Sequence, residues 1–217
     1  MNTPISHAYV TGSVSGTNNV GGLVGSSLGS ISHAYFTGSV SGESRVGGLV
    51  GNGRGNIGNA YATGSVTGTG DNVGGLVGHY SGITRSISNA YATGSVSGNE
   101  KVGGLVGYQS GTNSSIKNAY AIGWVSGTSS VGGLVGLKDG SFSTISNAYW
   151  DTQTTGQASS AGGVGRTTAQ LQQAATYASW DFSSTWSMPT DTGGYVFHSL
   201  PTLQGVTPKT GYQYFDA

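Results

Sequence analysis

Cysteine is absent from the 217-residue chain, and charged side chains make up only 7% of it. Without cysteine there is no disulfide and no thiol chemistry, and a zinc site lacks one of its commonest ligands. Eight Lys and Arg balance eight Asp and Glu, so no net charge attracts nucleic acid or an anionic membrane. No apolar run approaches the roughly 18 residues needed to cross a bilayer. We therefore expect neither nucleic-acid binding nor membrane insertion.

Glycine is the residue in excess, with 41 copies in 217, or about 19% where roughly 7% is usual. Each internal glycine costs a helix about 1 kcal/mol relative to alanine, which excludes a protein of long helices. Only four prolines occur and no G-x-y period runs through the chain, so collagen is excluded as well. Low charge together with abundant Val, Leu and Tyr argues against disorder.

An internal repeat is the strongest feature of the sequence. The phrase Ile-x-[His/Asn]-Ala-Tyr recurs six times, at intervals of 26, 26, 30, 29 and 29 residues, and five copies continue through a polar loop to Val-Gly-Gly-Leu-Val-Gly. Length changes fall almost wholly in the polar loops. The first phrase starts at Ile5, Ile31, Ile57, Ile87, Ile116 and Ile145, and the second covers Val20–Gly25, Val46–Gly51, Val73–Gly78, Val102–Gly107 and Val131–Gly136.

Within a repeat, side-chain character alternates with a period of two. Ala90 and Ala92 share one parity, whereas Tyr91, Thr93 and Ser95 share the other, which is the pattern of a half-buried strand. One unit of this length cannot bury a core alone, but stacked units can. We therefore predict an all-β fold, a right-handed parallel β-solenoid of about six coils over residues 1–165. An antiparallel, propeller-like array is a weaker alternative, because each blade needs about 40 residues.

The Val-Gly-Gly-Leu-Val-Gly segments are apolar on both parities, so the pattern leaves their inward face open. Their Gly-Gly pair predicts a bulge or a corner where a Cβ would clash. His7 and His33 hold a repeat position that Asn occupies in the other copies. This predicts a column of turn residues with hydrogen bonds along the stack.

Three outward-facing columns are the candidate binding surface. Tyrosine offers a large contact area at low entropy cost, which suits adhesion, and a regular hydroxyl lattice suits ice or a crystalline glycan. Strand propensity and stacking of identical residues between coils would also explain the columns without any ligand. The candidate binding residues are Tyr9, Tyr35, Tyr61, Tyr91, Tyr120, Thr11, Thr37, Thr63, Thr93, Ser13, Ser39, Ser65 and Ser95, with Tyr149 continuing the tyrosine column.

Residues 166–217 lack the repeat and are predicted to form a C-terminal cap. Thr167–Tyr177 is predicted as its one short helix, begun by Thr167 or Thr168. Ile122 and Trp124 replace Thr and Ser in the outward columns, and we predict that the cap folds back to bury both. The alternative is a binding or self-association patch. The aromatic residues that crowd the cap are Trp180, Phe182, Trp186, Tyr195 and Phe197.

The five Gly-Leu-Val-Gly segments resemble the GLUG motif, a repeat of large bacterial surface proteins that include filamentous-haemagglutinin-like adhesins. Tyr149-Trp150-Asp151 and Trp180-Asp181-Phe182 resemble the usual exit from such an array. The resemblance implies a β-rich module at the bacterial cell surface or outside the cell, and it implies no ligand. Because the repeat opens at Ile5 without a polar cap, we also expect a longer array in the native protein.

These features together predict a non-enzymatic, monomeric segment of an adhesin that presents its Tyr/Thr/Ser face and polar loops to a host or biofilm glycan or protein. We expect no catalytic residue, no metal and no cofactor. One alternative is an ice-binding solenoid, weakened by Tyr interrupting the flat face and by Ile122 in the Thr column. The other is a carbohydrate-active β-helix, in which Asp151 and Asp181 could imitate a glycosidase carboxylate pair.

Overall fold

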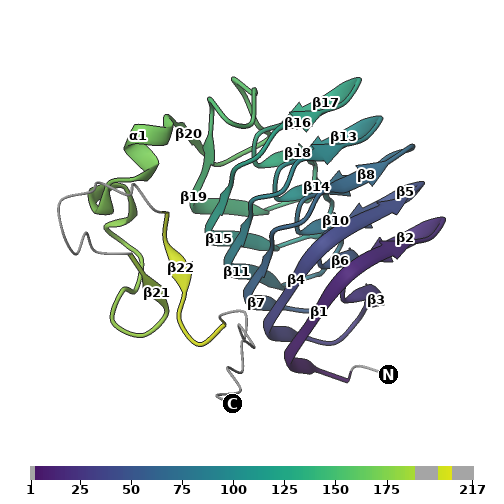
Figure 1. The fold of residues 1–217 in the computed structure, drawn as a ribbon, viewed down its shortest axis with the longest axis horizontal. Coiled ribbons are helices and arrows are strands. Elements are labelled where there is room, and N and C mark those ends of the chain that lie inside the picture. The colour runs from purple at the N-terminus through teal and green to yellow at the C-terminus, as the bar shows by residue number, and fades with distance from the viewer. Residues whose placement is uncertain (1–2, 189–199, 207–217) are drawn as a thin grey trace, which may run out of the picture.

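The computed structural model describes residues 3–188 and 200–206, and its strands stack into a parallel β-solenoid (Figure 1). Three parallel sheets run along the stack. The first contains β1 (Ile5–Ser15), β4 (Ile31–Gly42), β7 (Ile57–Ala62), β8 (Val66–Gly68), β11 (Ser86–Ala92), β12 (Val96–Ser97), β15 (Ser115–Ala121), β16 (Val125–Ser126), β19 (Thr144–Asp151) and β20 (Val164–Arg166). The second contains β2 (Asn18–Gly21), β5 (Ser44–Gly47), β9 (Val73–Gly74), β13 (Glu100–Gly103) and β17 (Ser129–Gly132). The third contains β3 (Val24–Ser27), β6 (Val50–Gly53), β10 (Val77–Tyr80), β14 (Val106–Gln109) and β18 (Val135–Lys138).

Equivalent residues of successive repeats pair with one another in parallel register. Tyr35 pairs with Tyr61, and Tyr61 with Tyr91. This confirms the parallel solenoid, but five turns are complete rather than about six. β19 begins a sixth turn whose remainder has no strands of the second or third sheet. There the Ser160 hydroxyl instead accepts hydrogen bonds from the amides of Leu134 and Val135.

Columns of identical apolar side chains fill the interior. Val46, Leu49 and Val50 are all fully buried, so both flanks of the Gly-Gly pair contribute to the core. This is possible because the pair forms a corner between the second and third sheets rather than a bulge. The other core columns contain Ile31, Ile57, Ile87 and Ile116; Ala34, Ala60, Ala90 and Ala119; and Val40, Val66, Val96 and Val125.

The Gly-Gly corner has no room for a side chain. A Cβ on Gly74 would overlap the carbonyl oxygen of Val77 in the same turn. A Cβ on Gly75 would overlap the carbonyl oxygen of Gly104 in the next turn and lie 2.8 Å from the Ala92 methyl group. The second glycine of each pair therefore lets adjacent turns approach to hydrogen-bonding distance.

The His/Asn column lies at a second corner of each turn, where the backbone is left-handed. Its φ angles lie between 48° and 52°, a conformation that Asn and His tolerate better than most residues. Asn89 Nδ2 donates to Asn59 Oδ1 at 3.0 Å, and Asn59 Nδ2 lies 3.1 Å from His33 Nε2. The His7 ring stacks on His33 with centroids 4.8 Å apart. The predicted column with hydrogen bonds along the stack is confirmed.

The segment after the repeats contains α1 (Thr168–Leu171), the 3-10 helix η1 (Ala174–Tyr177), β21 (Trp186–Ser187) and β22 (Thr202–Leu203). Thr167 begins α1 as predicted, in a reciprocal capping box with Gln170. The predicted single helix is wrong beyond Leu171, because Gln173 is extended. Leu171 and Tyr177 are six residues apart and would point to different sides of one helix, whereas the break lets both be buried. No helix within the described ranges is long and apolar enough to cross a membrane.

Candidate binding surfaces

The six outward tyrosines, which we call the tyrosine ladder, follow one another along the first sheet, and the first five form a continuous stack of rings. Neighbouring ring centroids lie 4.7–5.1 Å apart from Tyr9 to Tyr120, and the ring planes differ by 2–7°. The predicted parity is correct, since the ladder lies on the opposite side of the first sheet from the aliphatic core. The ladder is Tyr9, Tyr35, Tyr61, Tyr91, Tyr120 and Tyr149.

The prediction that this ladder faces solvent is wrong for all but its first member. Tyr9 is 52% exposed, whereas the other five tyrosines are between 2% and 8% exposed. The described residues 167–188 and 200–206, which we call the cap, lie alongside the first sheet and cover them (Figure 1). The buried cap residues in this second core are Leu171, Tyr177, Trp180, Trp186, Leu203 and Val206.

Hydrogen bonds fix the cap on the ladder. Tyr120 Oη donates to the carbonyl oxygen of Pro201 at 2.9 Å, and Trp180 Nε1 donates to that of Asn147 at 3.1 Å. Burial raises the pKa of Tyr120 well above its usual value, so its hydroxyl stays protonated and continues to donate. Of the expected aromatic cap residues, Trp180, Trp186 and Phe182 contribute to this core, while Tyr195 and Phe197 lie outside the described residues.

The threonine and serine columns remain accessible to solvent. Ser13, Ser39, Ser65 and Ser95 are exposed, and Thr11, Thr37, Thr63 and Thr93 are exposed or half-buried. The Ser13 and Ser39 hydroxyl oxygens lie 2.9 Å apart, within hydrogen-bonding distance along the stack. Thr63 and Ser65 flank a bend at Gly64, between β7 and β8. A bend at Gly94 separates Thr93 from Ser95 in the same way, whereas β1 and β4 run without interruption through the Thr and Ser positions of the first two turns.

The predicted burial of Ile122 and Trp124 is half right. Ile122 is partly buried and packs against the cap core, as expected. Trp124 is 59% exposed, so its predicted burial is wrong. Gly123 adopts φ of +99° and turns the chain away from the cap between these two residues. One side of the Trp124 ring instead lies against Gly156, where a Cβ would come within 2.8 Å of Trp124 Cη2.

Asp151 and Asp181, which could resemble a glycosidase carboxylate pair, are both engaged in local hydrogen bonds. Asp151 is buried and accepts hydrogen bonds from the amides of Gln153 and Thr154 and from the Thr168 hydroxyl. Asp181 accepts from three neighbouring hydroxyls at 183–185, which hold the pKa of its carboxyl below the usual value. Both carboxylates therefore organise local turns. Among the described residues, no three His, Asp or Glu side chains gather in a group suited to a metal.

His79 lies in an environment that lowers its pKa. Its ring stacks on Tyr108 at 4.9 Å, Nε2 lies 2.8 Å from Ser110 Oγ, and Nδ1 is buried without a partner. Burial, reinforced by Arg45 and Arg54, lowers the pKa of His79 from 6.5 to about 4, against a smaller opposite effect of Asp139. The ring is therefore neutral at pH 7.

We expect this histidine to reduce stability in mild acid. The unfolded chain takes up the proton first, so the free energy of unfolding should fall as the pH drops from about 6.5 to 4. The loss should be about 1–2 kcal/mol, because one pKa unit corresponds to about 1.4 kcal/mol and the ring is only partly withdrawn from solvent. Urea unfolding across this range should show a flatter profile for His79→Asn, which copies Asn52 of the preceding turn. An equal fall of the free energy of unfolding with pH in both proteins would contradict the assignment of this acid sensitivity to His79.

A comparison with protein-family models explains the repeated turns. The model of the GLUG motif matches residues 16–41, 42–67 and 98–126. The chain carries a GLUG-repeat region. Each matched unit contains one strand of the second sheet, the Gly-Gly corner, one strand of the third sheet and most of the first-sheet segment of the following turn. No curated protein and no solved structure matched the chain.

The structure continues the GLUG register through the unmatched turns. Val73 pairs with Val102, and Val102 with Val131, although residues 68–97 and those after 126 lie outside the matches. The repeated turns thus form a continuous scaffold with three surfaces. The tyrosine ladder is closed by the cap, whereas the hydroxyl columns with Trp124 and the polar loops remain open.

Proposed function

We propose that this chain is a non-enzymatic binding segment of a bacterial surface or secreted adhesin, and that it binds a glycan through one corner of the solenoid. We call this surface the corner face and define it as the open Thr and Ser columns together with Trp124. The exposure of Trp124 is the observation that carries the proposal. An exposed large aromatic side chain beside regular hydroxyl groups offers both stacking area and hydrogen bonds to a sugar.

The register places Trp124 at the end of the serine column. Val96 pairs with Val125, and the Val96 amide donates to the Trp124 carbonyl oxygen at 2.7 Å, so Trp124 occupies the position of Ser95 in the next turn. Its indole is supported by the backbone at Gly156 and is thus held in place before any ligand arrives. Such preorganisation lowers the entropy cost of binding.

Other observations support an adhesive rather than enzymatic role. Asp151 and Asp181 are engaged in local hydrogen bonds, and the corner face carries hydroxyl and indole groups in place of paired carboxylates. The open hydroxyl columns are the observation that favours the ice-binding alternative. The bends at Gly64 and Gly94 argue against it, because they interrupt a flat hydroxyl lattice in the third and fourth turns.

A glycan array probed with the whole chain tests the proposal. We expect binding to neutral or biofilm-derived glycans, and we expect Trp124→Ala to weaken it about tenfold or more, as for an interface hot spot. Phe142→Ala is the matched control, because Phe142 is 83% exposed on a loop away from the corner face. Binding that is indifferent to Trp124→Ala, or thermal hysteresis without glycan binding, would overturn the proposal.

A further inference from the structure

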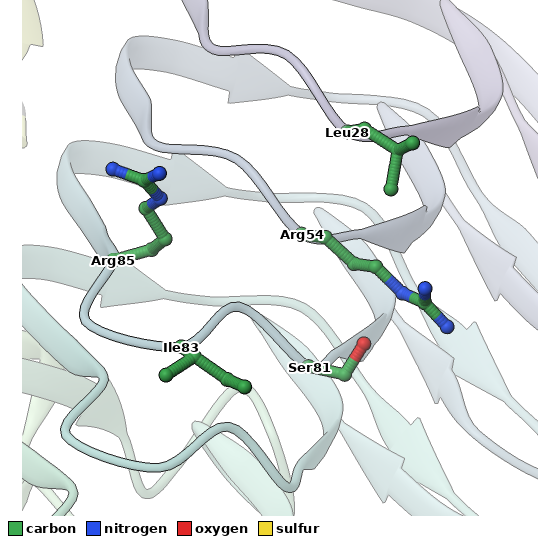
Figure 2. Close-up of a pocket in the computed structure, with 5 residues that line it drawn as sticks. All are labelled: Leu28, Arg54, Ser81, Ile83 and Arg85. Atoms are coloured by element: carbon green, nitrogen blue, oxygen red, sulfur yellow. The ribbon is translucent and has the colours of Figure 1, made fainter. Parts of the chain in front are cut away.

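The loops that follow the third sheet change length between the second and third turns. They span three residues in the first two turns, 28–30 and 54–56, and five in the next two, 81–85 and 110–114. The longer loops project beyond the shorter ones and leave a step in the side of the stack. A hollow of about 470 Å³ lies at this step, lined by Leu28, Arg54, Ser81, Ile83 and Arg85 (Figure 2). We call it the loop notch.

Two large aliphatic side chains are left open in the loop notch. Leu28 is 48% exposed and Ile83 is 69% exposed, although the stack buries almost every other aliphatic residue of its middle turns. Neither side chain belongs to either of the two buried cores. Exposed apolar side chains in a hollow that polar residues surround are typical of a ligand site.

The same hollow holds unpaired positive charge. Arg54 and Arg85 come from adjacent turns, and within the described part of the chain neither guanidinium has a hydrogen-bond or ion-pair partner. Figure 2 shows the two guanidinium groups directed outward on opposite sides of the notch. The charge of Arg54 is felt nearby, since it helps to lower the pKa of His79.

A hydroxyl group without a partner completes the notch. Ser81 Oγ is buried and makes no hydrogen bond within the described residues. Figure 2 shows it directed to the same side as the Arg54 guanidinium.

We propose that the loop notch binds an acidic saccharide. Arg54 and Arg85 bind two separate carboxylate or sulfate groups of the saccharide from opposite sides of the notch, and Leu28 and Ile83 contact the C–H face of a sugar ring. An extended acidic peptide fits less well, because it would need free backbone groups for strand pairing. The amides of Arg54, Ser81 and Thr84 already donate to neighbouring turns.

The experiment measures binding of the whole chain by calorimetry to three probes: a carboxylated oligogalacturonide, a sulfated heparin oligosaccharide and a neutral maltooligosaccharide. We expect one of the two acidic probes to bind through the notch residues, and any binding of the neutral probe to be independent of them. Arg54→Gln and Arg85→Gln should each weaken binding about tenfold, and Ile83→Ser should weaken it with an unchanged dependence on salt. The preferred acidic probe distinguishes carboxylate from sulfate recognition.

Lys117→Gln is the matched control, because Lys117 is an exposed cation on β15 outside the notch. It should change affinity by less than about twofold, as expected for a screened, distant charge. An equal loss of affinity with Lys117→Gln would show that binding depends only on overall positive charge, and it would overturn the proposal. So would the absence of acidic-saccharide binding, or tighter binding of a polyglutamate peptide. Trp124→Ala should leave acidic-saccharide binding unchanged. A failure of the loop-notch proposal can therefore be distinguished from a failure of the corner-face proposal.

Discussion

Gly75→Ala should destabilise the chain by about 3 kcal/mol or more, the upper range for overpacking, and prevent stable folding in the middle of the stack. The added Cβ would overlap the carbonyl oxygen of Gly104 and crowd the Ala92 methyl group. A backbone oxygen cannot rotate away as a flexible side chain can, so the two turns must separate. Separation stretches the hydrogen bond from Gly75 N to Gly103 O, now 3.2 Å. Because each turn is stabilised by its neighbours, the damage should spread along the stack.

Gly58→Ser is the matched control for this substitution. A Cβ at Gly58 would meet nothing closer than Ser88 Oγ at 3.5 Å, an ordinary contact. Serine already stands at the paired positions Ser32 and Ser88. Urea unfolding should therefore give Gly58→Ser the wild-type midpoint and Gly75→Ala a much lower one. A wild-type midpoint for Gly75→Ala would show that the turns are not packed this closely.

Trp186→Ala should cost about 3–5 kcal/mol, the range for a buried tryptophan, and should open the cap. Trp186 is fully buried and lies 4.3 Å from the Trp180 ring and 6.2–6.3 Å from Tyr91 and Tyr120. Its loss leaves a cavity between cap and ladder.

Deletion of all residues after Arg166 should have a larger effect and cause aggregation, because it exposes the whole tyrosine ladder.

Trp124→Ala is the control of equal size, with an expected loss below about 1 kcal/mol because its ring is mostly in solvent. Trp186→Phe adds a second comparison. The Trp186 indole nitrogen is buried and has no hydrogen-bond partner among the described residues, so phenylalanine removes this donor while keeping an aromatic ring. Thermal melts should rank the variants as Trp124→Ala, Trp186→Phe, Trp186→Ala in order of increasing damage. Equal melting temperatures for the two alanine variants would contradict the cap interface.

The sequence pattern predicted the scaffold well because every turn repeats the same physical requirement. Alternation assigned Tyr91 to the outer side and Ala92 to the inner side correctly. The left-handed corner was also predictable in part, since Asn59 and Asn89 stand where the backbone requires positive φ. A pattern of this kind states which side of a strand a residue occupies, but it does not state what covers that side.

The exposure of the outward columns was predicted less well, because the cap that covers the tyrosine ladder comes from a segment without a repeat. Nothing periodic marks Trp180 or Trp186 as partners of the tyrosine ladder. Ile122 and Trp124 share a parity, and only the turn at Gly123 separates the covered residue from the open one. The loop notch arises from a difference in length between neighbouring loops, which becomes a surface feature only when the turns are stacked.

Hydroxyl-radical footprinting with mass spectrometry tests the central claim most directly, namely that the cap closes the tyrosine ladder and leaves the corner face open. The account predicts strong labelling of Tyr9 and Trp124 and protection of Tyr61, Tyr120 and Trp186, in line with their exposed fractions. Labelling of Tyr61 and Tyr120 at the rate of Tyr9 would contradict it, because the ladder would then be an open surface and the cap would lie elsewhere.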